Sequence, residues 1–227
     1  MTASGENGIL AGMGKLRAGL LAGFSLAILG CASAPKSPLD RDITPRLVAE
    51  SGPTELEAVC REIDIPCGWE LVPSDASRFA ETITNERETG PARRFLDNLV
   101  ARRPVYRWFL SKDKQVINLA PKVIGANDPL DRPVWVDLDK LTTDAALAKL
   151  VESAGLKLVA PPQGTAEVYG EAARPGLVSL KAHGLRLRIA LNRLVQADGH
   201  SLWWCAQTSD PDAIRCAVPT WRSARAP

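Results

Sequence analysis

The apolar residues of this chain follow the same pattern in two places. Within residues 95–110, and again within residues 190–205, apolar side chains recur three and four positions apart, which predicts one buried face of a short helix. In each stretch a proline or a glycine then ends the helix, and an aromatic, strand-like run follows. The two stretches align without a gap. We therefore expect a helix that leads into a β-hairpin, used twice.

A second helix is expected ahead of each of these units. In the first case its apolar face is formed by Leu56, Val59, Cys60 and Ile63. In the second case the same face returns at a constant offset, at Leu147, Leu150, Val151 and Ala154. Short apolar runs that read as strands flank these helices, so each unit reads strand, helix, strand, strand, helix, hairpin. The sequence thus predicts an α+β fold built from two tandem small mixed α/β repeats.

Breaks in this pattern give the expected domain boundaries. Repeat 1 covers residues 46–121 and repeat 2 covers residues 134–219. Residues 122–133 contain several Gly, Asn and Pro residues and are expected to connect the repeats. Residues 31–45 hold the small residues and prolines typical of a tether, and residues 220–227 form a tail without a readable pattern. We expect the two repeats to stack as separable units.

Residues 1–30 have the pattern of an export signal. Lys15 and Arg17 supply a basic segment ahead of the apolar run 19–30. That run is too short to cross a bilayer as a helix, which needs about 20 apolar residues. Translation could start at Met13 as well as at the first residue. We therefore expect a signal peptide that is removed from the mature protein.

The apolar run ends in Ile28-Leu29-Gly30-Cys31, which resembles the lipobox of bacterial lipoproteins. The resemblance implies cleavage before Cys31 and attachment of lipid, palmitate among its acyl chains, to that residue. The alternative is a buried cysteine on an apolar helix. No Asp follows Cys31, so the inner-membrane retention signal of enteric lipoproteins is absent. This favours the periplasmic face of the outer membrane and leaves the inner membrane open.

Composition limits the classes of partner. The apolar fraction of 45% is ordinary for a globular chain. The sequence has 28 Lys and Arg against 26 Asp and Glu, and the signal peptide removes two basic residues and one acidic residue. The mature chain therefore has a net charge near +1, which leaves no electrostatic footprint for nucleic acid.

Four cysteines remain after the lipid-bearing one, and an even number in an exported chain indicates disulfides. The local pattern favours Cys60–Cys67 and Cys205–Cys216. For the second pair, a four-residue turn at residues 209–212 places Cys205 directly opposite Cys216 on two antiparallel strands, close enough to bridge. The rival interpretation of these thiols is a metal site.

A metal site requires ligands at particular spacings, and these are missing. There is no Cys-x-x-Cys pair, His183 lies far from every cysteine, and His200 with Cys205 has no second ligand pair nearby. The spacing of Cys60 and Cys67 also differs from that of thioredoxin-like redox motifs. We therefore expect no bound metal and no cofactor.

Catalytic motifs are also missing from the sequence. The chain has two histidines, each beside a glycine, and both read as surface turn residues rather than members of a triad. No nucleophile elbow, Walker loop or dinucleotide fingerprint occurs. We therefore expect a protein that is not an enzyme and has no catalytic residue.

Adjacent aromatic residues give the candidate partner surface. Trp203 and Trp204 are neighbours on an expected strand, so their side chains point to opposite faces and only one can fill a given core. Trp108 and Phe109 repeat this arrangement. The outer ring either packs on the neighbouring repeat or is an exposed anchor for a partner. The candidate partner surface comprises Trp204, Phe109, Arg186 and Arg193.

The second unit resembles a known family. Residues 147–158 are similar to the first helix and strand of the short N-terminal (STN-like) domain of secretins and TonB-dependent receptors, and residues 178–185 with 190–195 are similar to its second half. Repeat 1 is a more divergent copy. The resemblance implies a small mixed α/β module that docks periplasmic proteins and implies no catalysis.

The expected function is that of a lipid-anchored, periplasm-facing docking protein for an envelope protein, accessory to a secretion or uptake assembly. The rival function is a small-ligand-binding protein or enzyme with a pocket between the repeats, near Trp69 and Trp108. A polar pocket would favour the rival function, and a flat apolar patch around Trp204 would favour docking.

Overall fold

A computed structural model describes residues 37–45, 55–72, 89–113, 115–160, 177–199 and 201–219. All of these residues belong to one compact unit, Pro35–Pro227. The expected signal peptide, the lipid-bearing Cys31 and the tail at 220–227 lie outside the described residues. None of the helices in the described ranges is long and apolar enough to cross a membrane.

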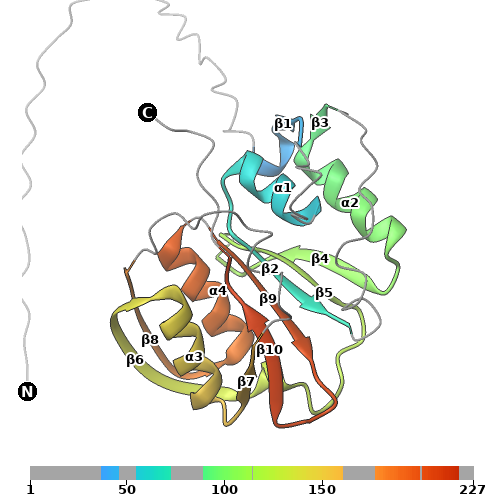
Figure 1. Ribbon diagram of the computed structural model, residues 1–227. Coiled ribbons are helices and arrows are strands. Elements are labelled where there is room, and N and C mark those ends of the chain that lie inside the picture. The colour runs from blue at the N-terminus through green and yellow to red at the C-terminus, as the bar shows by residue number, and fades with distance from the viewer. Residues whose placement is uncertain are drawn as a thin grey trace, which may run out of the picture. The chain divides into compact units, whose positions relative to one another are not determined.

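The described elements occur in the same order in two halves of the unit, which Figure 1 shows. The first half contains η1 (Pro38–Asp40), β1 (Asp42–Ile43), α1 (Glu55–Ile63), β2 (Cys67–Leu71), β3 (Gly90–Pro91), α2 (Ala92–Arg102), β4 (Tyr106–Leu110) and β5 (Ile117–Pro121). The second half contains η2 (Pro129–Asp131), β6 (Pro133–Thr142), α3 (Thr143–Ser153), β7 (Lys157–Val159), β8 (Leu177–Arg186), α4 (Leu187–Asp198), β9 (Leu202–Gln207) and β10 (Ala213–Ala217). The fold is therefore mixed α+β, as predicted.

Strand pairing is also the same in the two halves. β1 pairs antiparallel with β3 as β6 does with β8, and β4 pairs antiparallel with β5 as β9 does with β10. β2 runs parallel to β5 as β7 does to β10. Among the described strands, six form one sheet in the order β4-β5-β2-β9-β10-β7. The parallel pair β2–β9 joins the halves.

The predicted division into two separable repeats is wrong. One continuous sheet runs through both halves, because β2 of the first half hydrogen-bonds to β9 of the second along its whole length. The two halves therefore share a core framework, and residues 122–133 connect two parts of one structure.

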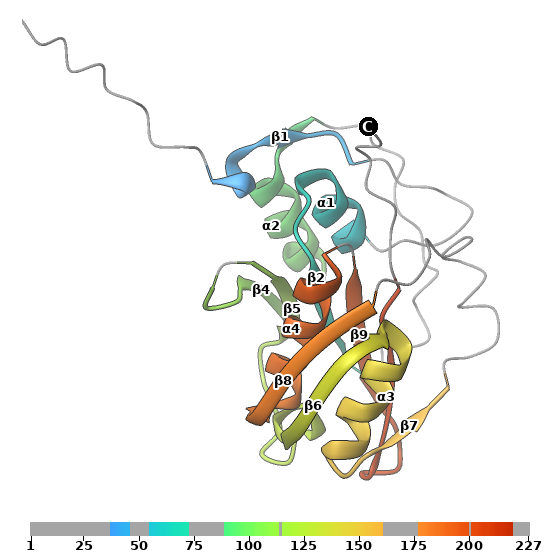
Figure 2. The same cartoon turned by 90° about the vertical axis from the view of Figure 1, so that its left-hand side faces the viewer.

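The two faces of this sheet are covered by different halves. Helices α1 and α2 pack with side chains of β2, β5 and β9 in one apolar cluster. Helices α3 and α4 pack on the other face, with side chains of β9 and β10, in a second cluster. The pair β6–β8 covers the outer side of α3 and α4 through its alternating buried residues, and its opposite face points to solvent (Figure 2).

Both halves begin earlier than the sequence analysis predicted. The sequence Pro-Leu-Asp-Arg forms η1 and returns, 91 residues later, as η2. Ser37 and Asp128 cap the two short helices, and Leu39 and Leu130 are buried in the two cores. The predicted tether (31–45) and connection (122–133) are therefore wrong in part, because each contains the first element of a half.

The turn after the first helix is also the same in both halves. Asp64 and Gly155, again 91 residues apart, both have positive φ, 59° and 68°. The next residue closes the turn in each case, with Ile65 N donating to Cys60 O (3.0 Å) and Leu156 N donating to Val151 O (3.1 Å). That the two halves are copies of one sequence module stays a prediction, which these matched bonds support.

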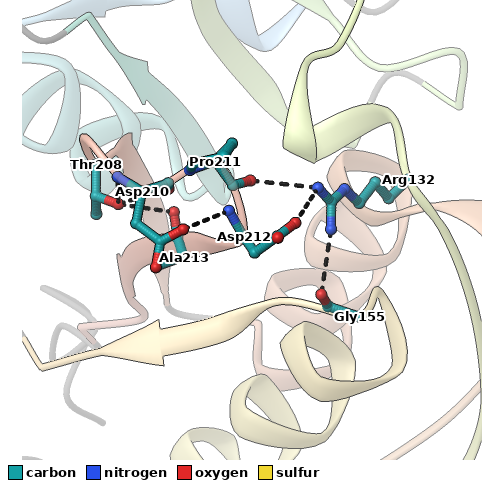
Figure 3. Close-up of polar contacts among 7 residues, drawn as sticks. All are labelled: Arg132, Gly155, Thr208, Asp210, Pro211, Asp212 and Ala213. Atoms are coloured by element: carbon teal, nitrogen blue, oxygen red, sulfur yellow. Dashed lines mark hydrogen bonds and ion pairs between the residues drawn. The ribbon is translucent and has the colours of Figure 1, made fainter.

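Arg132 holds three parts of the second half together, as Figure 3 shows. Its guanidinium donates to Gly155 O (3.1 Å) beyond α3, and to Pro211 O (3.2 Å) and Asp212 Oδ1 (2.9 Å) in the β9–β10 turn. The turn itself is closed by Thr208, whose hydroxyl bonds to the carbonyl oxygen of Ala213 (3.0 Å). These contacts fix the end of the hairpin against the α3–β7 turn.

Candidate functional sites

The hairpin disulfide lies where the strand register predicted it. Cys205 on β9 is paired directly with Cys216 on β10. The two residues form a disulfide, with Cα atoms 4.2 Å apart. Both are buried against α3 and α4, so the bond crosslinks two strands inside the second core.

The predicted Cys60–Cys67 disulfide is not formed. Cys60, on α1, and Cys67, the first residue of β2, are both free and both fully buried in the first core. Burial raises the pKa of the Cys67 thiol, and the neighbouring Cys60 thiol raises it further. The helix-to-strand turn brings the two thiols into contact, and apolar packing stabilises Cys67 as a neutral thiol.

Trp204 is not a surface anchor, which corrects the candidate partner surface. Its side chain is 4% exposed and lies in the cluster under α1 and α2, while Trp203 is fully buried on the opposite face. The reason is the β2–β9 pairing, in which Trp204 is adjacent to Trp69. The outer ring thus packs on the other half of the molecule, one of the two alternatives the sequence left open.

The other three candidate residues do not gather on one surface. Phe109 is half-buried on β4, under the guanidinium of Arg107 (5.6 Å). Arg186, at the end of β8, is paired with Asp131 (3.4 Å). Arg193, on α4, donates to a backbone carbonyl oxygen of β8 (3.3 Å). Each of these three side chains contacts a residue outside the predicted set, and Trp204 is buried, so the predicted combination with Trp204 is wrong.

An exposed aromatic surface lies instead on β6–β8. Trp135 is 67% exposed, and its ring is stacked on that of His183 with centroids 6.3 Å apart and an interplanar angle of 17°. Gly184 has positive φ, and a Cβ there would lie 3.3 Å from the Trp135 ring. His183 Nε2 lies 3.1 Å from Asp137 Oδ2. The alternation of residues 134–138 places Trp135 on the polar face of β6, and the sequence analysis missed this signal.

A buried ionic cluster lies between the sheet and the segment that leads to β6. Arg188, on α4, contacts Asp128 (2.9 Å), Glu70 (3.4 Å) and Asp131 (3.5 Å). The side chains of Glu70 and Asp128 are each 6% exposed. Arg188 thus neutralises part of the charge of two buried carboxylates, where charge is costly to bury, and of the more exposed Asp131 beside them.

Glu70 is the least satisfied member of this cluster. Its Oε1 atom has no hydrogen-bond partner among the described residues. Burial raises its pKa to about 7, against the lowering effect of Arg188; Asp128 and Asp131 raise it further, and Arg107 lowers it. Near neutral pH this carboxyl group is therefore divided between its neutral and charged forms.

A cavity of about 470 Å³ adjoins Glu70 and Asp128. Its floor is formed by the sheet and its wall by the segment between β5 and β6; the lining includes Gln207, Ile214 and Asn127, with no lysine or arginine among the described lining residues. It lies away from the predicted position, because Trp69 is buried in the cluster with α1 and α2 and is edge-on to Tyr106.

Metal-ligating residues do not cluster in the described part of the chain: no group of three or more His, Cys, Asp or Glu residues is suitably placed to hold an ion there. His183 contacts Trp135 and Asp137 among the described residues, and His200 lies outside them. The expectations that no metal and no cofactor bind stay predictions.

Comparison with known proteins adds no identity. No protein-family model, curated protein or solved structure matches this chain.

Proposed function

We propose that this chain is a lipoprotein, anchored through Cys31 at the periplasmic face of the outer membrane, that acts as a non-catalytic docking module for an envelope protein. The lipobox-like residues 28–31 support the anchor. The similarity of the second half to the STN-like domain supports a docking role in a secretion or uptake assembly.

The observation that carries the docking role is the exposed ring of Trp135. Tryptophan is strongly represented among the residues that dominate binding energy at protein interfaces. This ring is pre-positioned, since it lies over Gly184 and stacks on His183, so that little conformational entropy is lost when a partner covers it. The surface of β6–β8 around it carries both charges, Asp137 and Lys181, which suits a polar rim.

The test is site-specific crosslinking in intact cells. A photoreactive amino acid at position 135 should give a reproducible adduct with one envelope protein. The matched control is position 148, exposed on α3, which should give none. Trp135→Ala should reduce recovery of the partner and Trp135→Phe should retain most of it. No reproducible adduct from position 135 would contradict the docking function.

The second candidate function is binding of a small molecule in the cavity beside Glu70. Its volume lies within the range of ligand pockets, and two buried carboxyl groups line it. Arg188 pairs with both of them, but the Oε1 atom of Glu70 has no hydrogen-bond partner among the described residues. Such a lining suits a small ligand with a protonated amine. Native mass spectrometry of protein isolated from the envelope should then find a bound molecule, which Gln207→Trp should displace by filling the cavity. Ligand-free protein would argue against this function.

A further inference from the structure

Strands β4 and β9 hold equivalent places in two hairpins, and their outer edges differ in occupancy. β9 pairs with β10 on one side and with β2 on the other. β4 pairs with β5 on one side, and no described strand pairs with its other side. The edge of β9 is thus paired with β2, whereas the equivalent edge of β4 has no described strand beside it.

The backbone of β4 is oriented for pairing at this edge. At one end of the β4–β5 hairpin Lys122 N donates to Val105 O (2.8 Å), and at the other Ser111 N donates to Val116 O (2.8 Å). Backbone groups alternate in direction along an antiparallel strand. The N–H and C=O groups of Trp108 therefore point away from β5, toward the open edge.

The equivalent edge of β9 shows how an incoming strand is received. Leu202 N donates to Pro219 O (3.0 Å), so by the same alternation the backbone of Trp203 points toward β2. The Trp203 ring lies across Gly68 of β2, where an added Cβ would be 2.2 Å from the ring. Trp203 Nε1 donates to Asn192 Oδ1 on α4 (2.7 Å), which fixes the ring. A glycine is therefore required beside this tryptophan.

Trp108 is held in the same way, with no described strand beside it; the guanidinium of Arg93 on α2 lies over its ring, 5.7 Å from the centroid. Trp108 Nε1 donates to Asp97 Oδ1 on α2 (2.8 Å), and both residues lie 95 positions before their counterparts Trp203 and Asn192. Trp203 is fully buried, whereas Trp108 is only partly buried. The absence of a strand like β2 beside β4, in the part of the chain that is described, accounts for this difference.

We propose that the free edge of β4 binds an extended segment of a partner protein, which adds to the sheet as a parallel strand with a glycine beside Trp108. This goes beyond the docking function proposed above, since it concerns a surface other than that of Trp135. In the β2–β9 pair, Cys67, Gly68 and Trp69 lie beside Leu202, Trp203 and Trp204. The counterparts of these β9 residues on β4 are Arg107, Trp108 and Phe109.

This register gives the chemistry of the incoming segment. The residue before the glycine lies beside Arg107, which is exposed, so an acidic side chain suits that position. The residue after the glycine lies beside the half-buried ring of Phe109, so an apolar or aromatic side chain suits it. The expected core of the segment is therefore acidic residue, glycine, apolar residue.

A second copy of this chain fits the edge less well than a partner does. In the second half, β7 is the equivalent of β2. Among the described residues, β7 pairs only with β10 and has no strand on the side where β2 pairs with β9, so it is the strand that a second copy could offer to β4. The turns at Asp64 and Gly155 are closed by equivalent hydrogen bonds. Gly68 and Val159 each lie four residues after their turn, so Val159 is the counterpart of Gly68. The Cβ of Val159 would occupy the space that the Trp108 ring needs. Head-to-tail pairing of β7 with β4 is therefore disfavoured.

The test uses a peptide copied from β2 as the probe. The peptide has the sequence of residues 65–72 with Asp in place of Cys67, and the control peptide carries Gly68→Val in addition. Titrated into the ¹⁵N-labelled full chain, the first peptide should shift the amide signals of Trp108 and Leu110 most strongly. The control peptide should bind at least about tenfold more weakly, the equivalent of about 1.4 kcal/mol.

Variants of the protein separate this proposal from the docking function. Trp108→Ala should weaken peptide binding about tenfold while the circular dichroism spectrum stays unchanged, and Trp135→Ala should have no effect on it. Trp108→Phe keeps an aromatic cover over the glycine and should bind nearly as well as the original chain.

Four results would overturn the proposal: no binding at millimolar peptide, equal affinity for both peptides, shifts centred away from β4, or a dimer that Trp108→Ala dissociates. The last result would identify a second copy as the occupant. A crosslink from position 135 with no peptide binding at β4 would leave the docking function standing and refute only the strand addition.

Discussion

Replacing Gly68 with alanine tests the central contact of the fold. The new Cβ would lie 2.2 Å from Trp203 Cε2 and 2.4 Å from Trp203 Nε1, far inside van der Waals contact. The ring has nowhere to move, because it is fully buried and its Nε1 donates to Asn192. The backbone at Gly68 is not in the left-handed region, so alanine is tolerated there apart from the clash.

The expected cost follows from three contributions. Overpacking of a filled core costs about 1–3 kcal/mol. Displacement of the ring adds the loss of one buried hydrogen bond, about 1 kcal/mol. Replacing glycine restricts the unfolded chain and returns about 0.5 kcal/mol. Gly68→Ala should therefore lower the free energy of unfolding by about 1.5–3.5 kcal/mol.

Urea denaturation monitored by tryptophan fluorescence measures this change. Gly125→Ala is the matched control, because a Cβ there meets nothing within 4 Å; it should change stability by less than about 0.5 kcal/mol. Trp203→Leu makes room for the new methyl group, so Gly68→Ala should cost little in that background and the double-mutant cycle should show a coupling of about 2 kcal/mol. A cost that is equal in both backgrounds would refute the reasoning.

Four further outcomes are expected. Cys31→Ser should abolish metabolic labelling of the protein by a radiolabelled fatty acid; labelling that persists would contradict the lipid anchor. Thiol alkylation after unfolding without reductant should modify Cys60 and Cys67, and reduction of the hairpin disulfide should lower stability by about 2–3 kcal/mol. Because burial raises the pKa of Glu70 from 4.5 to about 7, the stability that this carboxyl group contributes should be fully present below about pH 4.5 and be lost as the pH rises through about 7; Glu57, whose pKa burial also raises to about 7, adds to the same decline. Glu70→Gln should flatten that decline, measured by urea titrations at both ends of the range. Arg132→Met should lower stability by about 1–2 kcal/mol, since three hydrogen bonds to the α3–β7 and β9–β10 turns are lost; no change would show that these exposed bonds contribute little.

Local patterns predicted the local structure well. The apolar spacing of residues 95–110 and 190–205 predicted helices that lead into hairpins, and the structure has α2 with β4–β5 and α4 with β9–β10 there. The disulfide followed from the register of one hairpin, which depends only on a short turn. Helix periodicity and hairpin register are set by neighbours in the chain, so a single sequence contains them.

Pairing between distant segments left no such signal. The β2–β9 contact joins residues more than a hundred positions apart, and its parallel register has no turn to fix it. Without it, Trp204 reads as a possible surface anchor, and the halves read as separable. The repeated Pro-Leu-Asp-Arg segment was visible in the sequence, but two 3-10 turns have no apolar period and were assigned to a tether and a connection.

Cysteine spacing also misled the sequence analysis. Cys60 and Cys67 are close in the chain and meet in space, yet their thiols are free in the first core. Whether two cysteines bridge depends on the geometry of their Cβ vectors, which a helix-to-strand turn sets and sequence separation does not.

The β2–β9 pair has a consequence for how the chain is synthesised. β2 leaves the ribosome more than a hundred residues before β9, and its edge and Trp69 stay without their partner strand for that whole interval. An unpaired apolar strand of this kind is prone to aggregate. Folding before synthesis is complete would therefore stop at an incomplete sheet, and the high sequence separation makes the closing step slow. A chain of this design benefits from being kept unfolded until its last strand is available, and truncation ahead of β9 is expected to leave the first half without a stable fold.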